Sequence, residues 1–130
     1  MLIFRTLIAK VLQMALLHDF GEIYAGDLTP ADRVDSEDKH RLEAQSVTRV
    51  LAKLPGGQVY LALWDEFERG ESAESQLVRQ IDRLEMALQA GVYERQGATG
   101  LDEFFDTAGQ AVKWPELRGI LDEVLRLRNL

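Results

Sequence analysis

The 130-residue sequence contains no cysteine. Disulfide bonds and thiolate metal ligands are therefore excluded, and any metal must be held by histidine, aspartate or glutamate. Basic residues are also few, because 15 lysines and arginines stand against 22 aspartates and glutamates. A net charge of −7 argues against nucleic-acid binding, which requires clustered positive charge. The composition fits the reducing cytoplasm, and we expect a cytoplasmic protein.

Several structural signals are missing as well. No stretch alternates apolar and polar residues as a strand does, and neither a glycine-rich phosphate loop nor an internal repeat occurs. The apolar amino-terminal segment, residues 1–17, is interrupted by Arg5 and Lys10 and lacks a signal-peptide cleavage site. It is also shorter than a membrane span usually requires. We predict a single all-α domain over residues 1–130 that does not enter a membrane.

Apolar periodicity and punctuating residues predict the positions of the helices. The expected elements are residues 1–17, 37–54, 59–68, 72–96, a short element at 101–108, and 115–128. Pro55, Gly56 and Gly57 end the second element, and Pro115 suits the first turn of the last. The first helix is apolar almost all round and is expected to need neighbours on most sides.

The segment HDFGEIYAGD, residues 18–27, brings residues suited to metal chemistry directly after the apolar run. On a helix, Glu22 lies four residues after His18 and three after Asp19, so the three share a face. Imidazole and carboxylate together favour zinc, manganese, cobalt or iron over the all-oxygen sites of calcium and magnesium. The alternative is that the doublet caps a helix end or is solvated.

Asp82 is a candidate for a more distant ligand. It lies beside the apolar stripe of the helix expected at 72–96, where a carboxylate requires a partner. A surface ion pair with Arg79 or Arg83 is the alternative.

Four segments in order carry a family resemblance: MALLHDFGEIYAGDLTPAD, EDKHRLEAQSV, QLVRQIDRLEMALQAGVYE and LDEFF. They resemble the HD-domain superfamily, and within it the small HD-domain 5′-deoxynucleotidases. The resemblance implies a helical bundle that binds a divalent cation (manganese, cobalt, zinc, iron or magnesium) through two histidines and two aspartates. It further implies hydrolysis of deoxynucleoside 5′-monophosphates to deoxynucleoside and phosphate, often by a homodimer.

The resemblance also implies roles for individual residues. His18 and Asp19 match the metal-binding doublet, and Asp82 matches the final aspartate ligand. Glu22 and Asp27 match acidic residues implicated in catalysis or in contacts around the phosphate and sugar. Because a carboxylate beside a metal can orient or deprotonate water, Glu22 is the expected base. Asp27 is expected to contact the sugar or assist the leaving oxygen.

The first metal-binding histidine of the family has no counterpart upstream of His18. The only other histidine, His40, lies in a polar stretch and is interpreted as a solvated helix residue. We therefore expect an amino-terminally truncated HD-domain bundle, or a homo-oligomer whose partner covers the apolar first helix. The alternative to a working phosphohydrolase is a non-catalytic HD-like module that binds nucleotides or other subunits.

Overall fold

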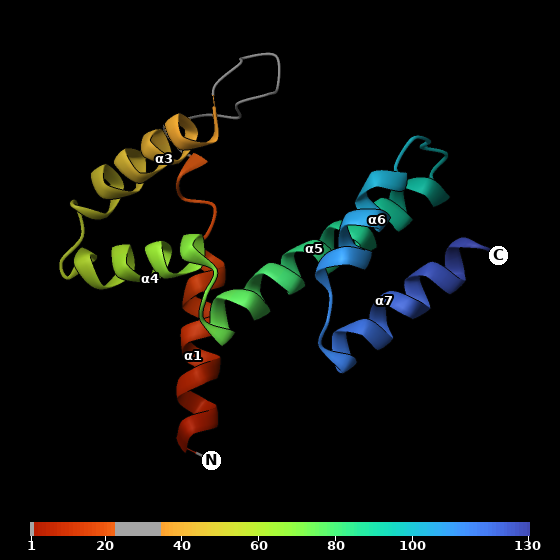
Figure 1. The fold of residues 1–130 in the computed structure, drawn as a ribbon, viewed down its shortest axis with the longest axis horizontal. Coiled ribbons are helices and arrows are strands. Elements are labelled where there is room, and N and C mark those ends of the chain that lie inside the picture. The colour runs from red at the N-terminus through yellow and green to blue at the C-terminus, as the bar shows by residue number, and fades with distance from the viewer. Residues whose placement is uncertain (1, 23–34) are drawn as a thin grey trace. The chain divides into compact units, whose positions relative to one another are not determined.

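The computed structural model describes residues 2–22 and 35–130, with side chains described from residue 8 onward (Figure 1). Within these residues the chain forms six α-helices and no strand. The all-α prediction is confirmed. The residues group into two compact units, Met1–Ser75 and Gln76–Leu130, which are considered separately below.

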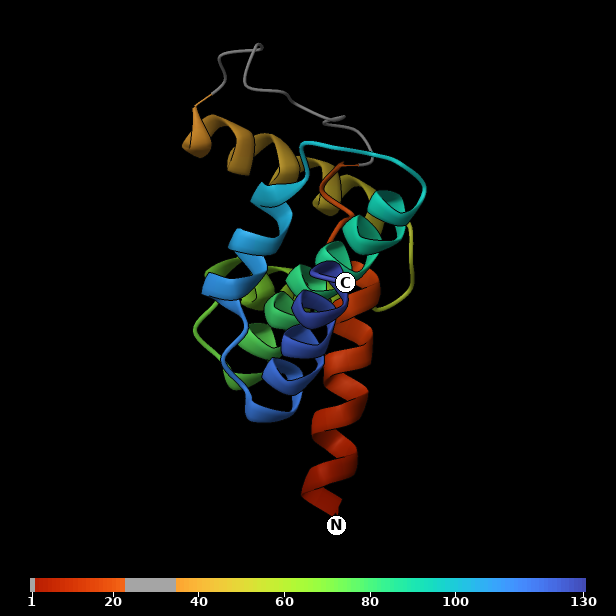
Figure 2. The same ribbon diagram turned by 90° about the vertical axis from the view of Figure 1, so that its right-hand side faces the viewer.

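Helix α4 (Gly57–Arg69) is the centre of the first unit. It packs against both α1 (Leu2–Leu17) and α3 (Ser36–Leu51), as the two views in Figures 1 and 2 show. All three helices contribute apolar side chains to the core between them. The buried residues are Met14, Leu17, Val47, Leu51, Leu63, Trp64 and Phe67.

Helix α1 has apolar residues on two faces but buries only one of them. Met14 and Leu17 lie in the core, whereas the side chains of Ile8, Leu12 and Leu16 are 51%, 60% and 76% exposed. The spacing of four places these three residues on one stripe of the helix. Among the described side chains of α1, residues 8–17, the expectation of neighbours on most sides is therefore met only on the face that α4 covers. None of the described helices combines the length and the apolar character that a membrane crossing requires.

Local hydrogen bonds set where the helices begin. Asp35 caps α3, because its side chain accepts hydrogen bonds from the backbone amides of Glu37 and Asp38, 2.7 and 3.0 Å away. In the same way, the Ser72 hydroxyl accepts from the amide of Ser75 at 3.1 Å and caps α5 (Ala73–Arg95). Because each cap fixes the residue at which its helix begins, it also sets which face of the helix each following residue occupies.

The second unit contains the rest of α5 together with α6 (Asp102–Ala111) and α7 (Pro115–Arg128), of which α6 packs on α7. Its core is built largely from small side chains. The buried residues are Leu84, Ala87, Ala90, Phe105, Ala108, Val112 and Leu121. Phe105 is buried, whereas the large apolar side chains of Phe104, Ile81 and Leu88 are exposed.

Two polar side chains tie the helices of this unit together. Gln80 is buried on α5, and its Oε1 accepts hydrogen bonds from the backbone amides of residues 113 and 114, at 2.8 and 3.0 Å. Arg128, near the end of α7, donates two hydrogen bonds of 2.9 Å to Glu94 and another to Asp102. Its guanidinium carbon lies 3.9 Å from the centre of the Phe105 ring. The hydrogen bonds to Glu94 and then Asp102 raise the pKa of Arg128 above its usual range.

Candidate metal site at the end of α1

The His18-Asp19 doublet lies in a turn that begins where α1 ends. The amide of His18 still makes a helical hydrogen bond to the carbonyl of Met14, at 2.9 Å. Beyond His18 the backbone hydrogen bonds span three residues instead of four: the amide of Phe20 donates to the carbonyl of Leu17 at 3.0 Å, and the amide of Glu22 donates to that of Asp19 at 3.1 Å. The sequence prediction placed His18, Asp19 and Glu22 on one helical face. His18 and Asp19 lie instead in a turn with three-residue hydrogen bonding, and helical structure resumes at Glu22.

The imidazole of His18 is held in one orientation. Its Nδ1 is hydrogen-bonded to the carbonyl oxygen of Ala15, and its ring packs edge-on against Phe67 of α4, with centroids 5.2 Å apart. Because a carbonyl only accepts, Nδ1 must carry the hydrogen, and in the neutral form of the ring the lone pair is then at Nε2. This is the tautomer in which Nε2 serves as a metal ligand and the opposite nitrogen is fixed by a backbone oxygen.

Asp19 places a second ligand atom beside Nε2. Its Oδ1 lies 3.3 Å from the buried Nε2 of His18, while the Asp19 side chain as a whole is 69% exposed. Two electron-rich atoms at this separation repel each other unless a positive charge, either a proton or a cation, lies between them. Ligands about 2.1 Å from one cation lie roughly 3 to 3.4 Å apart at tetrahedral or octahedral angles. The pair therefore fits a divalent cation of the zinc or manganese type.

The other predicted site residues, Glu22, Asp27 and Asp82, lie in different parts of the chain. Glu22 is exposed and stands where helical structure resumes after the turn of the doublet. Asp27 lies outside the described residues. Asp82 is half-buried on α5 and belongs to the second unit. Within residues 8–22 and 35–130, no three histidine, aspartate or glutamate side chains gather closely enough to hold a metal, so the ligand roles of His18, Asp19 and Asp82 stay predictions.

The turn is seated on a residue that the sequence analysis did not single out, Glu43 of α3. Gly21 approaches it so closely that a Cβ atom added to the glycine would lie 2.8 Å from the Cβ of Glu43. The Glu43 side chain is only 15% exposed, and its Oε1 lies 3.8 Å from the Lys39 ammonium group. Burial raises the pKa of Glu43, and the opposing effect of Lys39 does not offset it. A glycine two residues after the doublet was the available signal, but it does not identify its partner.

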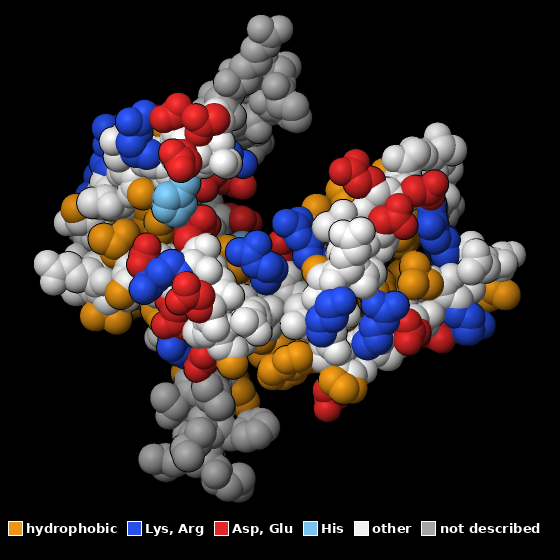
Figure 3. All heavy atoms as spheres, in the orientation of Figure 1, with side chains coloured by type: hydrophobic (Ala, Val, Ile, Leu, Met, Phe, Trp, Pro, Cys, Tyr) orange, Lys and Arg blue, Asp and Glu red, His pale blue; other side chains and the backbone are white. Residues whose placement is uncertain are grey.

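His40 is more constrained than the sequence interpretation allowed. Although its side chain is about half exposed, its ring stacks on Trp64 of α4, with centroids 5.9 Å apart and an angle of 15° between the planes. Its Nδ1 lies 3.3 Å from Oε2 of Glu68. Figure 3 shows acidic side chains gathered around a histidine over α3 and α4. His40 therefore joins α3 to α4 and is not simply solvated.

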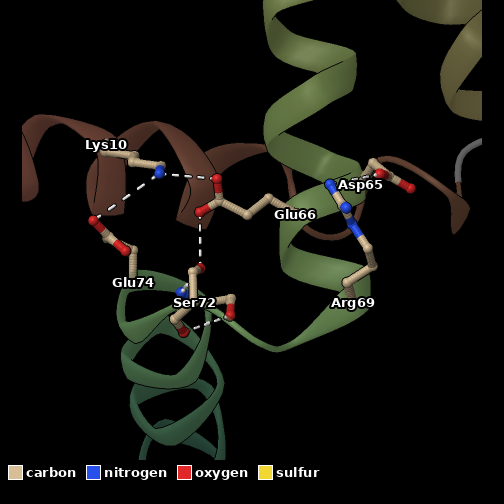
Figure 4. Close-up of polar contacts among 7 residues, drawn as sticks. Lys10, Asp65, Glu66, Arg69, Ser72 and Glu74 are labelled. Atoms are coloured by element: carbon tan, nitrogen blue, oxygen red, sulfur yellow. Dashed lines mark hydrogen bonds and ion pairs between the residues drawn. The ribbon is translucent and has the colours of Figure 1, made fainter.

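An ion-pair network fixes α1, which carries the doublet at its end, to the neighbouring elements (Figure 4). The ammonium group of Lys10 lies 2.8 Å from Oε1 of Glu66 on α4 and 4.0 Å from Glu74 at the start of α5. The Ser72 hydroxyl donates to the other oxygen of Glu66 at 2.8 Å. Burial raises the pKa of Glu66, but the hydrogen bonds from Lys10 and Ser72 outweigh it and the net pKa is lowered.

Comparison with known proteins places this arrangement in a family. The family model described as HD domain matches residues 5–117. The chain belongs to the HD domain family. This confirms the resemblance inferred from the sequence, and it explains why a His-Asp doublet stands at the end of a core helix.

The chain is also similar in sequence to curated relatives. The chain is 36% identical over 125 residues to 5′-deoxynucleotidase HDDC2 of Bos taurus, covering 92% of this chain and 60% of that protein. It is 38% identical over 117 residues to 5′-deoxynucleotidase HDDC2 of Danio rerio, covering 86% and 58%. The HD-domain chain thus spans about 60% of the length of these relatives.

A solved structure is also similar to the chain. It is a predicted metal-dependent phosphohydrolase from Magnetospirillum magnetotacticum MS-1, with 29% sequence identity and a TM-score of 0.62. The match covers 94% of this chain and 67% of that one. Membership of the HD domain family and this likeness together imply a divalent metal.

Proposed function

We propose that this HD-domain protein is a metal-dependent phosphohydrolase that converts deoxynucleoside 5′-monophosphates to deoxynucleoside and phosphate. The observation that carries the proposal is the His18-Asp19 pair, in which a fixed imidazole presents Nε2 3.3 Å from a carboxylate oxygen. The similarity to proteins named 5′-deoxynucleotidase supports the substrate class.

Each predicted residue has a defined task in this proposal. His18, Asp19 and Asp82 hold the divalent cation, which is manganese, cobalt, zinc, iron or magnesium. When bound, the cation supplies Lewis-acid chemistry, polarising a phosphoryl oxygen and acidifying water. Glu22, exposed beside the doublet, orients the attacking water and accepts its proton. Asp27 contacts the sugar or assists the leaving oxygen.

The proposal is tested by phosphate release from a panel of deoxynucleoside and ribonucleoside 5′-monophosphates in the presence of manganese or cobalt. We expect turnover of the deoxynucleotides, and a loss of at least about a hundredfold in Asp19→Asn and Asp82→Asn. Both substitutions conserve shape, so the fold should persist. Binding of Mn²⁺, measured by electron paramagnetic resonance, should weaken in both variants.

Asp106→Asn is the matched control, because it makes the same chemical change at an exposed position of α6. It should leave turnover and Mn²⁺ binding unchanged. A wild-type protein that binds no divalent cation and releases no phosphate from any substrate would refute the proposal. That result would favour the non-catalytic module.

We also propose that the protein forms a homo-oligomer. The exposed stripe of Ile8, Leu12 and Leu16 on α1 supports this, since contiguous apolar surface usually lies at an interface. Light scattering should give a mass above that of one 14.7 kDa chain, and Leu12→Glu should reduce it. A monodisperse wild-type monomer would contradict the proposal.

A further inference from the structure

The contact between Gly21 and Glu43 joins the turn of the doublet to α3. A Cβ atom added at Gly21 would lie 2.8 Å from Cβ, 3.1 Å from Cγ and 3.4 Å from Cα of Glu43. One of the three atoms is backbone, and the other two form the base of the Glu43 side chain rather than its mobile end. The backbone of the turn therefore rests on the stem of Glu43, and only glycine permits so close an approach.

The rest of the Glu43 side chain lies among charged groups of both signs. Its carboxylate lies 3.8 Å from the ammonium group of Lys39, one helical turn earlier on α3. Lys39 and His40 of α3 favour the charged carboxylate, whereas the like charges of Glu68 on α4 and of Glu22 oppose it. Burial raises the pKa of Glu43, so a neutral side chain of the same shape should be tolerated at this position.

We propose that Glu43 is a positioning residue that fixes the turn carrying Glu22 by forming the surface against which Gly21 packs. Glu22 follows Gly21 directly, so a displacement of that glycine moves the backbone from which the expected base projects. The assignment rests on the proposed function for the task of Glu22, whereas the seating of the turn rests on the packing alone. Glu43 acts through its stem, and its charge is secondary.

Steady-state kinetics separate this role from a general loss of structure. Glu43→Ala keeps Cα and Cβ but removes Cγ and the carboxylate, so Gly21 loses only the outer part of the surface on which it packs. We expect this variant to lower kcat by about fivefold and to change KM by no more than about twofold, because the positioning of the base is impaired. Glu43→Gln keeps the stem and should stay within about twofold of wild type. Glu37→Ala, at an exposed position on the same helix, is the control and should change neither constant.

Hydrogen–deuterium exchange tests whether the packing of Gly21 on Glu43 stabilises the turn, and it does not require an activity measurement. The amides of Phe20 and Glu22 donate to Leu17 and Asp19 within the turn, and their exchange should accelerate in Glu43→Ala but not in Glu43→Gln or Glu37→Ala. An unchanged exchange rate in Glu43→Ala would overturn the positioning role, and so would equal kcat values for the Ala and Gln variants. If the wild type lacks turnover, the proposed function fails, and exchange alone then decides whether Glu43 seats the turn.

Discussion

The ion pair between Lys10 and Glu66 offers a quantitative test of how α1 is held. The ammonium and carboxylate groups are 2.8 Å apart, and the two side chains are 33% and 25% exposed. At this distance the Coulomb attraction is between about 1 kcal/mol in water and several kcal/mol at the lower effective dielectric of a partly buried site. Desolvation and the ordering of two long side chains offset most of the larger value. We therefore expect a coupling free energy of about 1 kcal/mol.

A double-mutant cycle with Lys10→Met and Glu66→Gln measures this coupling. Gln at position 66 can still accept the hydrogen bond from Ser72, so the cycle isolates the charged interaction. Urea unfolding is followed by the fluorescence of Trp64, which is buried in the same unit, in a Trp114→Phe background. A loss of about 1 kcal/mol lowers Tm by roughly 3 to 5 °C for a chain of this size.

The pH dependence of the coupling follows from the two pKa shifts. The pKa of Glu66 is lowered in the folded state, so its contribution is complete above its unfolded pKa, about 4.3, and is lost as the pH falls through the folded value. The hydrogen bond to Glu66 raises the pKa of Lys10, so its contribution is complete below about pH 10.4 and is lost as the pH rises through the folded value. A coupling near zero at pH 7 and low salt would refute the reasoning.

Three further predictions concern stability. Gly57→Ala should cost about 2 kcal/mol or more in urea unfolding, because the new Cβ would lie 2.0 Å from the carbonyl oxygen of Leu51; no change would show that the start of α4 can shift freely. Gln80→Leu should cost about 2 kcal/mol and speed exchange of the two backbone amides that precede α7, since both lose their acceptor. Arg128→Met should cost about 1 kcal/mol, less in 1 M salt, and an equal loss at both salt concentrations would argue against an electrostatic origin.

Helix positions were accessible from the sequence because their determinants are local. Gly56 precedes the start of α4 and Ser72 caps α5, both through contacts within a few residues. Helix α3 ends at Leu51, three residues before the predicted end at 54. Helix α3 begins at Ser36, one residue before the predicted start, because Asp35 and not Ser36 provides the capping oxygen. Both residue types cap well, and only the backbone conformation distinguishes them.

Burial on α5 could not be predicted from apolarity alone. Ile81 and Leu88 are large and apolar but exposed, whereas Ala87 and Ala90 are buried against the rest of the second unit. Which stripe of such a helix is covered depends on its neighbours, and periodicity does not identify them. For the same reason the packing of Gly21 on Glu43, 22 positions later in the chain, was not foreseen. The doublet was found because its chemistry is adjacent in sequence.

Because His18 is hydrogen-bonded to the carbonyl of Ala15, the ability of the imidazole to bind a cation depends on the structure of helix α1. That carbonyl is correctly placed only while the last turn of the helix is formed. Fraying of this turn would release Nδ1, allow the ring to change tautomer and rotate, and remove the lone pair from its position beside Asp19. By thermodynamic linkage, any cation that binds through Nε2 must stabilise the end of α1, and any substitution that loosens α1 must weaken that cation's affinity.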